Sequence, residues 1–124
     1  GPNKPIKPDG ETNGYYSKPY NYSTSTIDAD DDEIFYLWNW GDGSDSGWIG
    51  PYYSGEVCKT MHIWMIKGSY LIKVKAKDGW GIESDWSDLL TVRMEKRKSD
   101  DLLCSFVLQK FGEKNILNKK DSFT

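Results

Sequence analysis

Apolar and aromatic residues alternate with polar ones in several short segments, a pattern typical of half-buried β-strands. The alternation is clearest over residues 70–77, where one face carries Tyr70, Ile72, Val74 and Ala76 and the other carries Leu71, Lys73, Lys75 and Lys77. Residues 34–40 place Ile34, Tyr36, Trp38 and Trp40 on a single face. Residues 15–26, 55–64 and 90–95 predict further strands in the same way.

Turn residues and composition shifts divide the chain into three parts. Residues 1–13 hold Pro2, Pro5 and Pro8 and predict an extended linker leading into a first edge strand. Residues 14–95 contain the alternating segments, separated by an acidic turn at 28–33, a tight turn at 41–44 and an irregular stretch at 48–51. Residues 96–124 form a basic tail in which apolar residues fall at helical spacing, which predicts a short amphipathic helix.

The composition favours a thin core built from a few large side chains. The 124 residues include 6 Trp, 8 Tyr and 4 Phe, although only 37% of the chain is hydrophobic. Short strands separated by turns indicate an all-β sandwich or barrel. We therefore expect about seven antiparallel strands followed by the short C-terminal helix.

Charge and length exclude several classes of partner. The net charge is -3, and residues 1–95 hold 9 Lys and Arg against 15 Asp and Glu, which gives 9 − 15 = −6. An acidic domain of this kind argues against nucleic acid. No apolar run approaches the roughly 18 residues that a transmembrane helix needs.

Lys73, Lys75 and Lys77 are expected to protect a sheet edge against aggregation.

The sequence offers little that could support catalysis. His62 is the only histidine, and no G-x-S-x-G segment supplies a nucleophile. With only two cysteines, Cys58 and Cys104, and one histidine, no zinc cluster is indicated. We expect both thiols to be free, His62 to be structural, Asp42 to fix its turn through backbone hydrogen bonds, and the protein not to be an enzyme.

Three segments together resemble the polycystic-kidney-disease (PKD) repeat. Residues 38–44 read W-N-W-G-D-G-S, close to the W-D-F-G-D-G-S signature of that family, and an acidic segment lies just upstream, as in the family. The segments His62-x-Trp64, Gly68-x-Tyr70-x-Ile72-x-Val74 and Asp78-x-x-Gly81 resemble its C-terminal half. The version seen here is most similar to modules of archaeal surface proteins. Asn39 and Asp31 depart from the family, which has Asp and Gly there.

The resemblance implies an immunoglobulin-like β-sandwich in which Trp38, Trp40 and Tyr70 are structural. It also implies a non-catalytic extracellular or cell-surface module for protein interaction, adhesion or spacing in a multidomain protein. Its partners would be other domains of the same chain or surface proteins. No cofactor is required, and calcium is the one candidate: family members that bind it imply Asn3, Asp28, Asp30 and Asp78 as ligands.

Two alternatives stay open from the residues themselves. The acidic segment lacks the glycine and the glutamate of an EF-hand, so it also fits a solvated turn. Trp48, Tyr52, Trp80 and Trp86 fit a ligand-binding surface, which would make the protein a carbohydrate-binding accessory domain of a secreted hydrolase with glycans as partners, or they cover the ends of the core.

Overall fold

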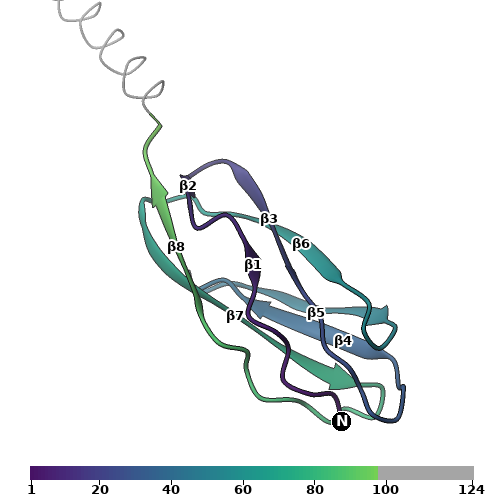
Figure 1. The fold of residues 1–124 in the computed structure, drawn as a ribbon. Helices are drawn as coiled ribbons and strands as arrows, with labels where there is room; N and C mark the ends of the chain where they lie inside the picture. The colour runs from purple at the N-terminus through teal and green to yellow at the C-terminus, as the bar shows by residue number, and fades with distance from the viewer. Residues whose placement is uncertain (98–124) are drawn as a thin grey trace, which may run out of the picture.

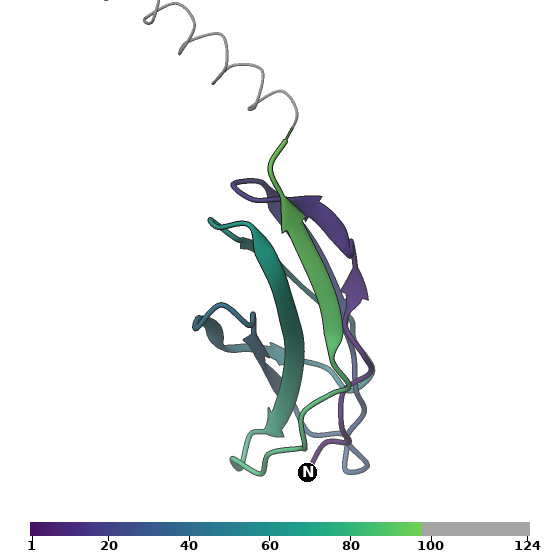
Figure 2. The ribbon, with the colours of Figure 1, turned by 90° about the vertical axis from the view of Figure 1, so that its left-hand side faces the viewer.

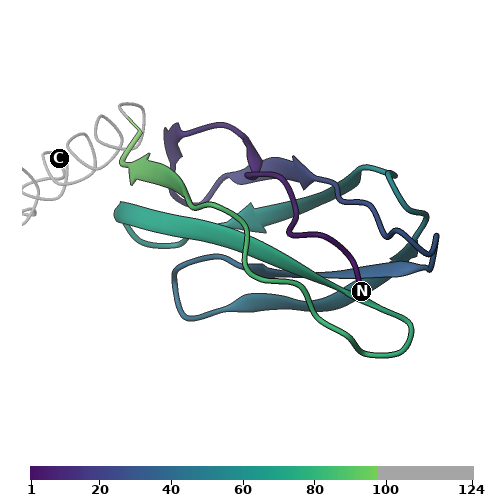
Figure 3. The same ribbon diagram turned by 60° about the horizontal axis from the view of Figure 1, so that its bottom comes forward.

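The alternating segments fold as strands of two facing sheets, as a computed structural model shows for residues 1–97 (Figure 1). One sheet has the order β1–β3–β6 and the other the order β2–β8–β7–β4–β5. Their bounds are β1 Asp9–Gly10, β2 Asn13–Tyr15, β3 Pro19–Thr24, β4 Ile34–Asn39, β5 Asp45–Tyr52, β6 Cys58–Ile63, β7 Gly68–Asp78 and β8 Leu90–Glu95. Figure 3 shows the two layers, with β4 in one and β3 and β6 in the other. The fold is an immunoglobulin-like β-sandwich.

The core lies between the sheets and consists mainly of large rings. The inward residues of β4 and its extension, Ile34, Tyr36, Trp38 and Trp40, are all buried, as the alternation predicted. Tyr22 and Trp64 join them across the interface. The hydroxyl of Tyr70 donates to the backbone carbonyl of Ile66 just upstream, an arrangement that resembles the tyrosine corner of immunoglobulin-like sandwiches.

The turn after β4 needs glycine at Gly41. This residue has a φ of 80°, a conformation that favours glycine, and a Cβ there would lie 2.6 Å from the backbone oxygen of Leu71. The side-chain oxygen of Asn39 accepts a hydrogen bond from the Gly41 N–H at 3.0 Å. An amide therefore fixes this turn where the PKD family has a carboxylate.

Strand β5 includes residues 48–51, which the sequence pattern predicts to be irregular, so that prediction is wrong. The strand contains Gly47, Gly50 and Pro51, residues that are normally depleted in strands. It is an edge strand that pairs only with β4, with register shifts along that pairing. An edge position tolerates proline, which has no backbone N–H, because one side of an edge strand has no neighbouring strand with which to form hydrogen bonds.

The expected sandwich of about seven strands is confirmed, since the described residues form eight. Two details differ from the expectation. Strand β2 runs parallel to β8, whereas the other pairings are antiparallel. Lys73, Lys75 and Lys77 do not protect an edge, because β7 lies in the interior of its sheet between β4 and β8. The pairing of terminal strands is not local in sequence, so alternation alone could not reveal it.

The two ends of the described chain lie at opposite ends of the sandwich. The N-terminus is at one end, and β8 runs out at the other (Figures 1 and 2). The proline-rich N-terminal residues contact the domain, since the Asn3 and Ile6 N–H groups bond to the carbonyls of Ile27 and Ser25. Within residues 1–97, no helix is long and apolar enough to cross a membrane.

Cys58 is a free and buried thiol, and burial raises its pKa. Cys104 and the helix predicted within residues 96–124 lie outside the described residues.

Tyr36 provides the first test of the core. Its hydroxyl oxygen accepts a hydrogen bond of 3.0 Å from the buried Thr26 N–H, and burial raises its pKa to about 12. Tyr36→Phe leaves this N–H without a partner, so we expect it to lower the free energy of unfolding by about 1–3 kcal/mol. Tyr53→Phe is the matched control, because Tyr53 is 78% exposed. Denaturant unfolding checks both, and equal effects of the two variants would contradict this account of Tyr36.

Candidate functional site

Three carboxylates from two distant segments meet at the end of the sandwich that holds the N-terminus. Asp28 and Asp32 lie in the loop between β3 and β4, and Asp78 ends β7. One oxygen from each lies within 4.8 Å of the others. Asp28 and Asp78 are only 4% and 2% exposed. We call Asp28, Asp32 and Asp78 the acidic cluster.

Backbone hydrogen bonds orient the two buried members of the acidic cluster. One oxygen of Asp28 accepts from the Asp30 N–H at 2.8 Å, while its other oxygen is buried without a hydrogen-bond partner. One oxygen of Asp78 accepts from the N–H groups of Trp80 and Ile82 at 2.9 and 3.0 Å. The other lies 3.8 Å from the terminal amine of Gly1. Each side chain is therefore fixed through one oxygen.

The cluster fits a hard divalent cation. Its donors are all oxygens, the ligands that Ca²⁺ takes in proteins. Burial, together with the negative charges of Asp28, Asp30 and Asp78, raises the pKa of Asp32. Protonation of Asp32 or a bound cation would relieve this repulsion. The unpartnered Asp28 oxygen is costly when buried, and a cation would compensate it.

The structure brings together some of the expected metal ligands and not others. Asp28 and Asp78 lie together, but Asp30 is exposed and Asp32 takes its place in the cluster. Asn3 is exposed, and its backbone carbonyl accepts from the Thr26 hydroxyl at 2.6 Å. Asp31, where the family has glycine, adopts a φ of 62°, which explains the family preference. Asp32 was not among the ligands that the family resemblance implied, and its place in the cluster depends on the conformation of this loop, which includes the left-handed Asp31.

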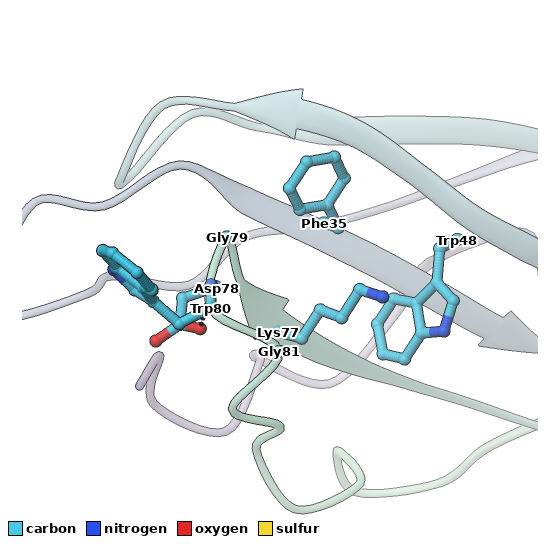
Figure 4. A pocket seen from close by; sticks show the side chains of 7 residues that line it. All are labelled: Phe35, Trp48, Lys77, Asp78, Gly79, Trp80 and Gly81. Carbon is cyan, nitrogen blue, oxygen red and sulfur yellow. Dashed lines mark hydrogen bonds between the residues drawn. The ribbon is translucent and has the colours of Figure 1, made fainter.

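The four candidate aromatic residues do not form one surface. Tyr52 packs edge-on against the core residue Tyr36, with ring centroids 5.5 Å apart. Trp48 and Trp80 both line a shallow groove with Phe35 and Lys77 (Figure 4). Trp80 is 83% exposed. Trp86 is half-buried and lies beneath the ammonium groups of Lys73 and Lys75, and Lys75 also lies 5.9 Å from the centre of Trp48, so these two indoles share the outer face of the sheet.

His62 and Asp42 form a part-buried pair that connects β6 to the turn after β4. The His62 Nε2 atom lies 2.8 Å from an Asp42 oxygen, and the His62 ring stacks on Trp40 with centroids 4.6 Å apart. Partial burial acts to raise the pKa of Asp42, but hydrogen bonds from Ser44 and His62 outweigh it and hold that pKa below its usual value.

This arrangement does not supply hydrolytic chemistry. The Ser44 hydroxyl donates to Asp42, so the carboxylate stands between the serine and the histidine. A catalytic triad needs the histidine in the middle, where it takes the serine proton. Ser44 therefore has no histidine base, and the pair acts as a structural clasp.

Comparisons with known proteins place this sandwich in a class of accessory modules. No protein-family model matches the chain. The PKD domain of an M14-like peptidase from a Thermoplasmatales archaeon is 45% identical and superposes with a TM-score of 0.71, covering 77% of this chain and 96% of that domain. The chain belongs to the PKD domain family.

Two more distant proteins also match. Collagenase ColA of Bacillus cereus is 31% identical over 93 residues, which span 71% of this chain but only 9% of the collagenase. The CARDB domain of the PF1109 protein from Pyrococcus furiosus, solved with di-metal ions, superposes with a TM-score of 0.54 at 11% identity. It covers 76% of this chain and 94% of that domain, and at this identity the likeness shows the fold alone.

The clasp between Asp42 and His62 can be tested through pH. Asp42→Asn removes a charge-assisted hydrogen bond and should lower the free energy of unfolding by about 1 kcal/mol at neutral pH. Because folding depresses the pKa of Asp42, its contribution is complete above the unfolded-state value, about 4, and disappears as pH falls through the folded-state value. Wild type and variant should therefore converge in acid.

Asp45→Asn is the control for this experiment. An Asp45 oxygen accepts from the Gly47 N–H at 2.8 Å, a bond that an asparagine oxygen can also make. Chemical denaturation of the three proteins between neutral and acidic pH gives the comparison. An Asp42→Asn protein as stable as wild type at neutral pH would contradict the clasp.

Proposed function

We propose that this domain is a non-catalytic extracellular module of a cell-surface or secreted multidomain protein, where it spaces neighbouring domains and supports protein interaction or adhesion. The observation that carries this proposal is the similarity to a PKD domain of a peptidase along 96% of that domain. The collagenase match supports the same role, because it covers only 9% of that enzyme. The parent protein of this module would by analogy be a secreted hydrolase or a surface protein.

Chain geometry supports spacing. The N-terminus and the end of β8 lie at opposite ends of the sandwich, so neighbouring domains would follow one another in line (Figure 2). Strands β2 and β8 are parallel, and two backbone hydrogen bonds at the ends of their pairing join them. The Tyr16 N–H donates to the Glu95 carbonyl, and the Arg93 N–H donates to the Thr12 carbonyl. Tension applied through the two ends loads these strands along their length, so their hydrogen bonds must break together.

A pulling experiment tests this spacing role. In single-molecule force spectroscopy on a tandem array, the domain should unfold in single all-or-none steps. Gly14→Ala should lower the unfolding force, because a Cβ on Gly14 would lie 2.5 Å from the Tyr20 ring, whose hydroxyl accepts from the Tyr15 N–H in β2. Gly79→Ala is the control, since no atom lies within 4 Å of its added Cβ. Gradual extension at low force, or equal effects of both variants, would contradict the spacing role.

The exposed ring of Trp80 favours one alternative, a carbohydrate-binding accessory domain of a secreted hydrolase. Exposed indoles stack on sugar rings, and Trp80 shares its groove with Trp48. Retention on insoluble polysaccharide that is lost in Trp80→Ala would favour this alternative.

Calcium at the acidic cluster is part of the proposed function. The cluster joins the β3–β4 loop to the end of β7, and the isolated bridge between Pro2 and Asp28 brings the N-terminal segment beside it. A cation there would stiffen the end at which the chain enters the domain. Its ligands would be Asp28, Asp32 and Asp78, with further oxygens from the backbone, water or Asn3 completing the shell.

Melting temperatures measured with and without calcium test the acidic cluster, because Asp32→Asn is expected to act differently in the two conditions. Calcium at about 10⁻⁴–10⁻³ M, the range of extracellular modules, should raise the melting temperature of the wild type. Asp32→Asn should abolish that rise, yet without calcium it should melt above the wild type, because folding raises the pKa of Asp32 against its neighbours. Asp31→Asn is the control, since Asn tolerates a positive φ. No shift of the wild type with calcium would end the calcium hypothesis.

A further inference from the structure

The outer face of the larger sheet carries a row of lysines on one interior strand. Lys73, Lys75 and Lys77 occupy alternate positions of β7, so they repeat every ~6.6 Å along the strand. Their ammonium groups lie over indole rings: Lys73 is 4.5 Å and Lys75 is 4.8 Å from the centre of Trp86, and Lys77 is 4.4 Å from that of Trp48. We call these five residues the lysine–indole face.

The indoles hold the ammonium groups without neutralising them. A cation–π contact is attraction to a ring quadrupole, so the lysine keeps its full charge. Lys75 also pairs with Glu83 at 2.6 Å. Within residues 1–97, no carboxylate lies within ion-pair distance of Lys73 or Lys77. Among the described residues, two positive charges on this face therefore have no ion-pair partner, although residues 1–95 are mainly negative.

The row is ordered before any ligand arrives. The three lysines are half-buried, and β4 places Phe35 and Leu37 directly opposite Lys77 and Lys75. Figure 4 shows the Lys77 side chain extending toward Trp48. A free lysine loses much rotamer freedom when it binds, whereas these side chains have lost part of it already.

We propose that the lysine–indole face binds an extended acidic peptide segment of a partner protein. Side chains on the same side of an extended peptide also repeat every ~6.6 Å, so carboxylates at every second residue meet Lys73, Lys75 and Lys77 in register. This inference rests on the proposed interaction role and names the chemistry of the partner.

The surrounding charges set the limits of this face. Glu83 competes with the peptide for Lys75, so Lys73 and Lys77 make the main contacts. At the Lys77 end of the lysine–indole face, Asp32 and Glu33 lie beside Trp80 and would repel further carboxylates of the peptide. The face thus accommodates a short acidic segment whose first and third alternating carboxylates contact Lys73 and Lys77, while the middle one competes with Glu83 for Lys75.

Fluorescence anisotropy with a labelled Glu-Thr-Glu-Thr-Glu peptide at low salt tests the proposal. The double variant Lys73→Gln/Lys77→Gln should weaken binding about tenfold, the loss expected for two ion pairs that solvent still reaches. The control Lys59→Gln/Lys67→Gln removes the same net charge from lysines outside the face and should leave affinity unchanged. Glu83→Gln should tighten binding, because it frees Lys75. Thermal melts confirm that each variant is folded.

Several outcomes would overturn the proposal. Equal weakening in the two double variants would show attraction by overall charge alone. No binding by the wild type at millimolar peptide would rule out an acidic peptide as the partner. Equal binding of a Glu-Glu-Glu-Thr-Thr peptide would rule out the proposed register of alternating carboxylates. Binding of a uronic-acid polymer in place of the peptide would assign the face to a glycan. None of these results changes the unfolding force or the calcium response, so the spacing role stands or fails separately.

Discussion

Contact between aromatic rings at Trp40 joins the two sheets, and much of the structure depends on it. Trp40 stacks on Trp38 of its own sheet at 5.3 Å and on His62 of the opposite sheet at 4.6 Å, and the edge of Trp64 closes the group at 6.1 Å. The Trp64 N–H donates to the Trp40 carbonyl at 3.2 Å. These few rings supply much of the apolar surface that a core of this size needs. Asp42 holds the His62 ring against Trp40, so its turn belongs to the core as much as to the surface.

This core also determines the outer surface. Because strand side chains alternate between faces, burying Ile72, Val74 and Ala76 obliges Lys73, Lys75 and Lys77 to point outward in one row. The same rule on β4 places Phe35 and Leu37 beneath them. The lysine–indole face is therefore a consequence of core packing, and its spacing cannot drift without breaking the core.

Strand identity could be predicted where alternation was strong, and much less where it was weak. Both β4 and β7 were evident because each buries one complete face, whereas glycines and a proline concealed the edge strand β5. The partners of β2 and β7 depend on contacts between residues far apart in sequence, which no local pattern encodes. The resemblance to the PKD family predicted that Asp28 and Asp78 lie together. It did not predict that Asp32, which follows the left-handed residue Asp31, joins them in the cluster instead of Asp30.

Groups of like charge lie close together at two places in the domain, and different contacts hold them in each. In the acidic cluster, backbone N–H groups fix carboxylates close together, so repulsion is built into the fold and a cation would relieve it. On the lysine–indole face, aromatic rings contact the ammonium groups without cancelling their charge, so that charge stays available to a ligand. A carboxylate has no comparable attraction to the face of an aromatic ring, because the ring quadrupole is negative there. The carboxylates are therefore held together by backbone N–H groups, whereas the lysines are ordered by the aromatic residues in which this sequence is rich.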